Sequence, residues 1–147
     1  PFVMEKKGLT PQEADTLMNK KSGLFGICGT SDMRDVHASI EKGDEKALLA
    51  FKMLVRSIKK ILGAYFFLLG RVDSIVFPAG IGENDELVRE AVCEGLEAFG
   101  IKLNKEENRL RKPGARTISA SDSRIPVLVI PTNEELMIAM DTASLVG

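Results

Sequence analysis

The sequence FPAGIGEND, at positions 77–85, joins an apolar segment to a predicted helix through a proline and two glycines. Backbone N–H groups at such a junction, together with the helix dipole, suit a ligand that carries oxygens or ring acceptors. Gly80 and Gly82 would let a ring or a phosphate approach the backbone. Asp85 stands where a dinucleotide-binding loop has its third glycine, and the loop lacks the lysine of a Walker A motif, so both motifs are excluded. The alternative is a tight turn whose glycines serve only packing.

A glutamate after a second apolar run could hold a magnesium ion. In the sequence TNEE, at positions 132–135, a capping box between Thr132 and Glu135 would leave Glu134 without a structural role. A carboxylate in this first helical turn, just past a buried strand, can hold Mg²⁺ through water beside a phosphate. The alternative is a carboxylate that only stabilises the helix dipole, and the residues alone leave both interpretations open.

An arginine near the start of another predicted helix opposes the dipole of that helix. In TSDMRD, at positions 30–35, Asp32 and Asp35 suit a helix N-terminus, whereas Arg34 does not. A guanidinium in this position is a candidate for stacking on a base or pairing with a phosphate. The alternative, which the spacing alone favours, is a salt bridge between Arg34 and a neighbouring carboxylate.

Helices and a few short strands must position these residues. Apolar residues at helical spacing predict helices, and short runs rich in β-branched residues predict strands. A strand, a turn and a helix follow one another twice, which predicts parallel strands in an α/β layer. We expect a shaped glycine loop at 22–29, a helix cap at Thr30 or Ser31, and a polar connector at 104–116. The expected helices span 10–20, 30–42, 44–69, 83–99 and 132–146, and the expected strands span 72–77, 117–118 and 126–130.

The predicted helix 44–69 has an apolar stripe and ends in AYFFLLG, at positions 64–70. Because this end is apolar all round, we expect it to be buried on several sides. Gly63 costs about 1 kcal/mol relative to alanine inside a helix, which indicates that a neighbour packs closely against it. The predicted sheet is small for so much helix, which indicates that further strands lie in sequence outside this chain.

The composition is that of a globular domain without a preference for polyanions. Twenty lysines and arginines and 21 acidic residues among 147 give a net charge of −1, so we expect neither nucleic acid nor a membrane as a partner. Cys28 and Cys93 lack metal-ligand spacing, and we expect both to be reduced thiols. With no apolar stretch long enough to span a membrane and no signal-peptide pattern after Pro1, we expect a cytoplasmic fragment or processed product.

Four segments, in the same order along the chain, resemble the C-terminal part of the acetokinase family of acetate, propionate and butyrate kinases. The resemblance extends from about residue 17 to the end of the sequence, and its four ordered segments make it more specific than any single motif. The segments are SGLFGICGTSDMRD (22–35), AYFFLLGRVDSIVFPAGIGEND (64–85), VREAVCEGLEAFGIKLN (88–104) and VLVIPTNEELMIAMDT (127–142).

The resemblance implies a partial actin-like ATPase domain of the ribonuclease H-like class, which is a helix-rich α/β fragment with a small sheet. Residues 1–147 would form the C-terminal, nucleotide-side portion of a two-domain acyl kinase, without the N-terminal domain and the first strands of the second domain. The parent enzyme would transfer the γ-phosphoryl group of ATP to acetate with Mg²⁺, giving acetyl phosphate and ADP. The alternatives are a propionate or butyrate kinase, or a non-catalytic nucleotide-binding module of the same fold.

The resemblance also implies roles for individual residues. Glu134 would hold Mg²⁺, and no catalytic residue is expected within the chain, because those residues would lie in the absent N-terminal part. We therefore expect the chain alone to be inactive, and the parent enzyme to be a homodimer that binds a nucleotide and a short-chain carboxylate. The expected nucleotide-binding residues are Asp32, Met33, Arg34, Gly80, Ile81, Gly82 and Asn84.

The chain departs from the common family pattern at the glycine turn. It has Phe-Pro-Ala-Gly where the family usually has Phe-Thr-Gly-Gly or Phe-Thr-Ala-Gly. Pro78 therefore removes a hydroxyl group and a backbone N–H from the neighbourhood of the expected nucleotide. This departure affects the expected contacts to phosphate. It leaves as predicted the adenosine-binding loop that the resemblance implies for Gly80, Ile81 and Asn84.

Overall fold

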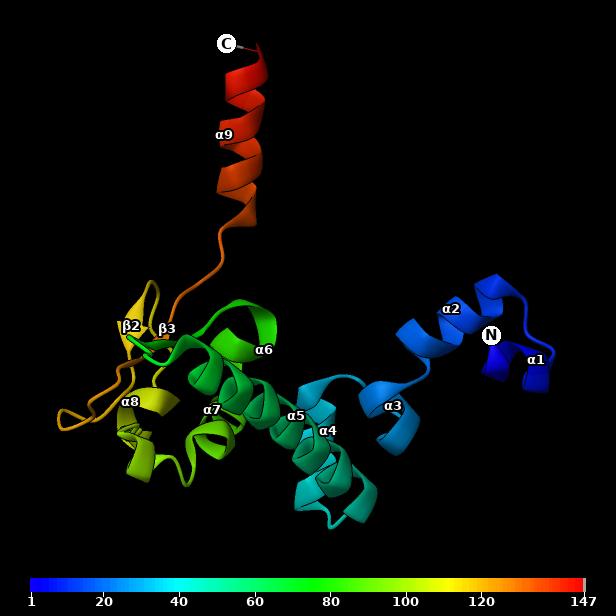
Figure 1. Cartoon of the computed structure of the whole chain (residues 1–147), viewed down its shortest axis with the longest axis horizontal. Coiled ribbons are helices and arrows are strands. Elements are labelled where there is room, and N and C mark those ends of the chain that lie inside the picture. The colour runs from blue at the N-terminus through cyan, green and yellow to red at the C-terminus, as the bar shows by residue number, and fades with distance from the viewer. Residues whose placement is uncertain (147) are drawn as a thin grey trace. The chain divides into compact units, whose positions relative to one another are not determined.

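A computed structural model describes residues 1–146 of the chain. The chain divides into two compact units, and the division lies within helix α5 (Glu45–Leu69), between Leu62 and Gly63. Figure 1 labels the elements along the chain. No helix within the described residues is both long and apolar enough to cross a membrane.

The first unit consists of helices. They are α1 (Phe2–Lys7), α2 (Pro11–Lys20), α3 (Gly23–Cys28), α4 (Met33–Glu41) and the first part of α5. The start of α2 confirms the predicted capping box, because the Thr10 hydroxyl accepts a bond from the Glu13 backbone N–H at 3.3 Å, and the Glu13 carboxylate accepts one from the Thr10 N–H at 2.8 Å. Helix α4 begins on Asp32 and not on Thr30 or Ser31, since the Asp32 carboxylate accepts the N–H of Arg34 at 2.9 Å.

Helix α3 occupies the segment that was predicted to be an irregular glycine loop. Gly29, with φ of 81°, ends the helix in the left-handed conformation that glycine adopts readily. A side chain on Gly26 would lie 3.1 Å from the carbonyl oxygen of Lys21. Gly26 therefore allows α3 to approach the end of α2 closely. The prediction of a loop was wrong.

The C-terminal end of α5 is exposed, although its composition predicts burial. Phe67 and Leu68 are 86% and 80% exposed. Within the described residues no atom lies within 4 Å of the position that a side chain on Gly63 would take, so the predicted close neighbour is not found. Only Ala47 and Ala50 of this helix are buried. Helical periodicity identified the apolar stripe, but it carries no information on which surface covers it.

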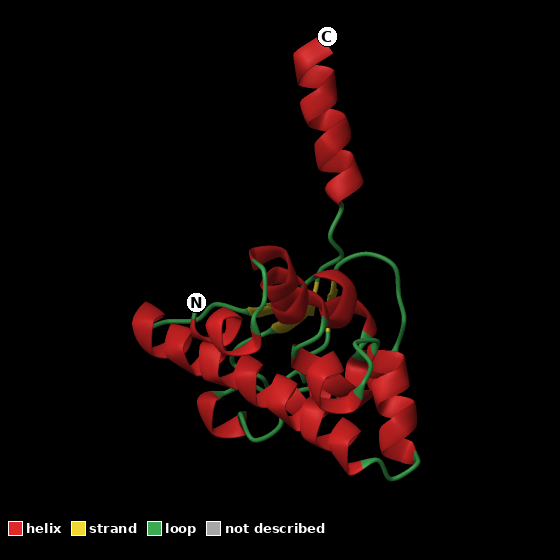
Figure 2. Cartoon of the chain, turned by 90° about the vertical axis from the view of Figure 1, so that its right-hand side faces the viewer, coloured by secondary structure: helices red, strands yellow, loops and turns green. Residues whose placement is uncertain are grey.

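The second unit contains a three-stranded sheet, whose strands are yellow in Figure 2. The strand order is β1–β3–β2. Strands β1 (Ile75–Phe77) and β3 (Val127–Val129) are parallel, with Ile75 opposite Val127, which confirms the predicted parallel pair. Strand β2 (Arg116–Thr117) runs antiparallel to β3. Both ends of β1 and of β3 are buried, and together with Ile101 and Ile118 they form the core of this unit.

The helix predicted at 83–99 is broken into three elements. They are α6 (Ala79–Asn84), α7 (Glu86–Cys93) and the 3₁₀ turn η1 (Glu97–Phe99). The first break lies at Asp85, whose carboxylate accepts the N–H groups of Leu87 and Val88 at 3.1 and 3.0 Å and so caps α7. The second lies at residues 94–96. The connector predicted at 104–116 contains α8 (Lys105–Arg109), which Asn104 caps. Helix α9 (Glu134–Val146) ends the described chain, and every residue in it is exposed.

Candidate functional site

The turn after β1 leads directly into α6. The two glycines there, Gly80 and Gly82, have different surroundings. A side chain on Gly82 would lie 3.1 Å from the backbone carbonyl carbon of Phe77, so Gly82 lets α6 pack against the end of β1. Within the described residues nothing lies within 4 Å of the corresponding position on Gly80. Gly82 therefore meets a packing requirement, whereas Gly80 leaves an open surface on the turn.

Three predicted nucleotide-binding residues lie together on the exposed part of α6. Ile81 is 42% exposed, and Gly80 and Asn84 are also exposed. The Asn84 side-chain amide donates a hydrogen bond to the Gly80 carbonyl at 2.9 Å, which fixes the amide against its own helix. This face offers an apolar side chain, a backbone without a Cβ and an oriented amide, which suits a ring with hydrogen-bonding edges.

The turn after β3 is tied to the turn after β1. The Thr132 backbone N–H donates to a carboxylate oxygen of Glu83 at 2.8 Å, and the Thr132 hydroxyl donates to the same oxygen at 3.3 Å. This hydroxyl also accepts the N–H of Ala79 at 3.0 Å. Ala79 has a φ of 58°, which is uncommon for a residue other than glycine.

The predicted capping box between Thr132 and Glu135 is wrong, because Thr132 makes these bonds instead. Helix α9 is capped by Asn133, whose side-chain oxygen accepts the N–H of Leu136 at 3.0 Å. Glu134 is exposed in the first turn of α9. Asparagine is as good an N-cap as threonine. The sequence therefore allowed α9 to be capped by either Thr132 or Asn133.

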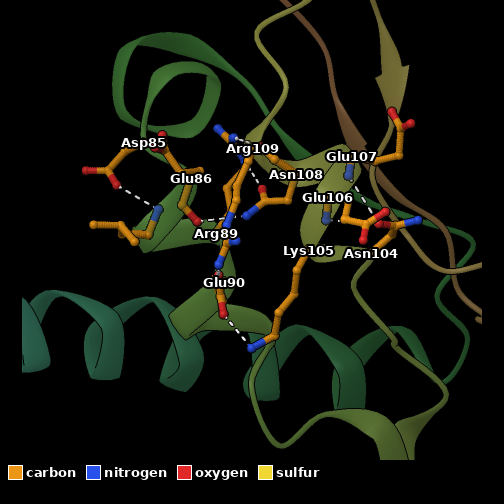
Figure 3. Close-up of polar contacts among 11 residues, drawn as sticks. Asp85, Glu86, Arg89, Glu90, Asn104, Lys105, Glu106, Glu107, Asn108 and Arg109 are labelled. Carbon is orange, nitrogen blue, oxygen red and sulfur yellow. Dashed lines mark hydrogen bonds and ion pairs between the residues drawn. The ribbon is translucent and has the colours of Figure 1, made fainter.

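A buried arginine supports α6 from within the second unit (Figure 3). Arg89 is 2% exposed and Asn108 is fully buried. The Arg89 guanidinium donates to the carbonyl oxygens of Gly82 and Glu83 at 2.8 and 2.9 Å. It also donates to the side-chain and backbone oxygens of Asn108, both at 2.7 Å. The Asn108 amide in turn donates to the Glu86 carbonyl at 2.9 Å, so this network joins α6, α7 and α8.

Burial lowers the pKa of the Arg89 guanidinium, and the positive charge of Arg116 lowers it further. Glu86 and Asp85 act in the opposite direction. The guanidinium stays charged, because arginine does not lose its proton in proteins. Sequence reasoning missed this residue. The signal that could have found it is a charged residue on the apolar face of α7, next to Val88.

In the first unit, Arg34 is paired with Asp32. The two side chains approach to 2.5 Å, and the Arg34 side chain is 90% exposed. The salt bridge that the spacing favoured is therefore present. Met33, between the two, is 8% exposed and anchors the start of α4.

The hydrogen bonds from the Arg34 guanidinium and backbone lower the pKa of the Asp32 carboxyl to about 2, from an ordinary value of 3.8. Because the pKa is lower in the folded chain, the pairing stabilises the fold fully above the ordinary pKa. This contribution is lost as the pH falls through about 2. At neutral pH the carboxylate is ionised and holds the guanidinium in place.

The predicted site residues fall into two groups. Asp32, Met33 and Arg34 belong to the first unit, and Gly80, Ile81, Gly82, Asn84 and Glu134 belong to the second. Within residues 1–146, no group of three or more side chains could hold a metal ion by itself. Glu134 nevertheless fits a magnesium site of the kind in which one or two carboxylates act together with substrate phosphates and water.

Comparison with known proteins gives consistent matches. A sequence model of the acetokinase family matches residues 1–140. The acetate kinase of Desulfovibrio desulfuricans is 69% identical across the whole of this chain, which covers 37% of that protein. The acetate kinase of Campylobacter fetus is 48% identical and is also covered to 37%. The chain therefore spans little more than a third of the length of these curated relatives.

Solved structures of two kinases superpose on the chain. The crystal structure of the acetate kinase of Porphyromonas gingivalis matches with a TM-score of 0.87 at 41% identity, covering 99% of this chain and 37% of that one. The crystal structure of a propionate kinase from Francisella tularensis matches with a TM-score of 0.80 at 34% identity, covering 94% of this chain and 35% of that one.

Proposed function

Because this chain belongs to the acetokinase family and shares the actin-like α/β fold of its relatives, we propose that it is the C-terminal, nucleotide-side portion of a two-domain acetate kinase. The parent enzyme transfers the γ-phosphoryl group of ATP to acetate and forms acetyl phosphate and ADP. The observation that carries this proposal is the identity of 69% with an acetate kinase across the whole chain. A propionate kinase is the second candidate, since one superposes with a TM-score of 0.80.

The exposed face of α6 is the proposed adenosine site. Ile81 contacts the base, the open backbone at Gly80 admits the ring, and the oriented amide of Asn84 supplies a hydrogen bond. Gly82 contributes indirectly, because it permits the packing that places α6 at the end of β1. The site lies at the carboxyl end of a parallel strand, where open α/β sheets commonly bind ligands.

Charged residues are proposed to act on the phosphate end of the nucleotide. Arg34 pairs with phosphate oxygens, and Asp32 keeps the guanidinium oriented through their hydrogen bonds. Met33 anchors this turn through its buried side chain. Glu134 holds Mg²⁺, which neutralises phosphate charge when it is bound. We propose that the parent enzyme is a cytoplasmic homodimer that uses neither nucleic acid nor a membrane.

A thermal-shift experiment tests the proposed nucleotide site in the 147-residue chain. MgADP at about ten times its dissociation constant should raise the stability of the chain by about 1.4 kcal/mol, which appears as a higher melting temperature. Asn84→Ala should weaken ADP binding about tenfold, because it removes one oriented hydrogen bond.

Asn19→Ala is a matched control for this experiment. It removes a similar exposed hydrogen bond, from Asn19 to Asp15 at 2.7 Å, from helix α2. Its affinity for ADP should equal that of the wild type. If neither MgADP nor MgATP shifts the melting temperature of the wild-type chain, the proposed site is wrong.

We expect the 147-residue chain alone to form no acetyl phosphate. Phosphoryl transfer depends on charge neutralisation and positioning from several sides of the substrates, and this chain spans 37% of a related acetate kinase. A coupled assay that follows ADP formation in the presence of acetate measures this directly. Turnover from the chain alone at the rate of a full-length enzyme would contradict the expectation.

A further inference from the structure

We infer that Glu83 is a positioning residue that ties the turn after β1 to the turn before α9. Through this tie it fixes the position of the proposed magnesium carboxylate, Glu134, relative to the proposed adenosine face of α6. The inference rests on the proposed function, because that function assigns a ligand to each turn.

The contacts form a closed link between two segments that are about fifty positions apart in the sequence. The Glu83 carboxylate oxygen accepts both the backbone N–H and the hydroxyl of Thr132, at 2.8 and 3.3 Å. The same hydroxyl accepts the N–H of Ala79 at 3.0 Å. Since Ala79 and Glu83 lie one helical turn apart in α6, Thr132 fixes this helix at two points.

The backbone of Glu83 is held independently from the protein interior. The guanidinium of Arg89, which is 2% exposed, donates to the carbonyl of Glu83 at 2.9 Å and to that of Gly82 at 2.8 Å. The main chain at Glu83 is therefore anchored inside the second unit while its carboxylate reaches the neighbouring turn. A side chain that extends from a fixed backbone is suited to holding a neighbouring turn in place.

The turn before α9 needs such a tie, because α9 itself contributes no buried residue. Every residue from Glu134 to Val146 is exposed. The first turn of α9 is oriented by Asn133, which caps it, and by Thr132, which is bonded to Glu83 and Ala79. The position of Glu134, two residues after Thr132, consequently depends on the acceptor that Glu83 provides.

This geometry requires an oxygen acceptor at position 83 and does not require a negative charge. A single carboxylate oxygen accepts both bonds from Thr132, and the amide oxygen of glutamine can take its place. A carboxylate that bound Mg²⁺ or took part in phosphoryl transfer would lose its function on conversion to glutamine. The pair Glu83→Gln and Glu83→Ala therefore separates the two roles.

The kinetic test uses the full-length enzyme that carries this chain. Glu83→Ala should raise the KM for MgATP about three- to tenfold, because the adenosine face and the metal carboxylate are no longer held in register. The KM for acetate should stay unchanged. Glu83→Gln should keep the KM for MgATP within about twofold of the wild type. Thr132→Val, which removes the hydroxyl, should raise this KM, and Thr132→Ser should restore it.

A structural test uses the 147-residue chain and no nucleotide. Hydrogen exchange of the Thr132 backbone N–H should accelerate about tenfold in Glu83→Ala and should stay close to the wild-type rate in Glu83→Gln. The effects of Glu83→Ala and Thr132→Val should be less than additive when combined, because both remove the bond between the Thr132 hydroxyl and the Glu83 carboxylate.

Two results would overturn the inference. The first is an equal rise in the KM for MgATP in Glu83→Gln and Glu83→Ala, which would show that the charge is needed. The second is a loss of stability in Glu83→Ala with every KM unchanged, which would leave only a structural role. Failure of the proposed function is separate, because the wild-type chain would then not respond to MgADP, while the exchange of Thr132 would still report the link.

Discussion

Replacing Arg89 with alanine is expected to lower the free energy of unfolding of the second unit by about 3–5 kcal/mol. The substitution leaves the carbonyls of Gly82 and Glu83 and both oxygens of Asn108 without the donor that binds them. The two Asn108 oxygens are buried, and each buried acceptor that loses its partner costs about 1–3 kcal/mol, whereas the carbonyls of Gly82 and Glu83 are only partly buried and can bond to water instead. The removed side chain also leaves a cavity between α7 and α8.

Urea unfolding followed by circular dichroism measures this loss, and amide exchange of buried Val92 and Val127 assigns it to the second unit. Arg109→Ala is the matched control. The Arg109 side chain is 63% exposed and lies 3.9 Å from Glu90, so its removal should change the stability by less than about 0.5 kcal/mol. Equal effects of the two substitutions would contradict the role assigned to the buried network.

Asn108→Asp adds a more detailed comparison within the network. Aspartate keeps the oxygen that accepts from Arg89 and adds a favourable charge, but it loses the donor to the Glu86 carbonyl. Asn108→Ala loses both interactions. We therefore expect the aspartate variant to be the more stable of the two, and the reverse order would indicate that burying a carboxylate beside the Glu86 carbonyl costs more than its bond to Arg89 contributes.

The second large effect is expected for Gly82→Ala, which should destabilise the second unit by about 1–3 kcal/mol. The added methyl group would lie 3.1 Å from the carbonyl carbon of Phe77 and 3.4 Å from its Cα. The clash involves the backbone of β1, which cannot move aside without disturbing the pairing of β1 with β3. The same urea experiment measures it.

Gly80→Ala is the control, because no described atom lies within 4 Å of its added methyl group. This substitution should leave stability almost unchanged or raise it slightly, since alanine favours a helix over glycine. It should nevertheless weaken ADP binding if the open backbone at Gly80 admits the ring. A larger loss of stability in Gly80→Ala than in Gly82→Ala would contradict the packing described for α6.

Local sequence signals predicted several elements of the fold well. The capping box at Thr10 and Glu13 marked the start of α2, and the two β-branched runs identified β1 and β3 as a parallel pair. Both features depend on residues that are close together in the sequence or on a simple alternation of strand, turn and helix. A glycine turn was predicted after β1, but the helix α6 that contains its glycines was not.

Features that depend on long-range contacts could not be predicted. The break at Asp85 is a different case, because it comes from a local cap: the Asp85 carboxylate accepts the N–H groups of Leu87 and Val88, and the sequence alone also permits an aspartate inside a continuous helix. Thr132 was wrongly predicted to cap α9. Its actual partners, Ala79 and Glu83, lie about fifty residues earlier, and local sequence gives no sign of them. Arg89 belongs to no sequence motif. Three of its four acceptors are backbone carbonyls, which every sequence has, and the fourth is the side-chain oxygen of Asn108 in α8.

The exposure of α9 has a consequence for Glu134, the proposed magnesium carboxylate. A helix of 13 residues without a covering surface is only marginally stable in water, because the cost of nucleating its first turn is barely recovered over so short a length. The segment therefore depends on packing against another surface for a stable helix. Glu134 stands in the first turn of α9, where the helix nucleates. The proposed binding of Mg²⁺ to Glu134 and helix formation in α9 should therefore be thermodynamically linked. Added Mg²⁺ should raise the helicity of α9, and a surface that stabilises α9 should raise the affinity for Mg²⁺.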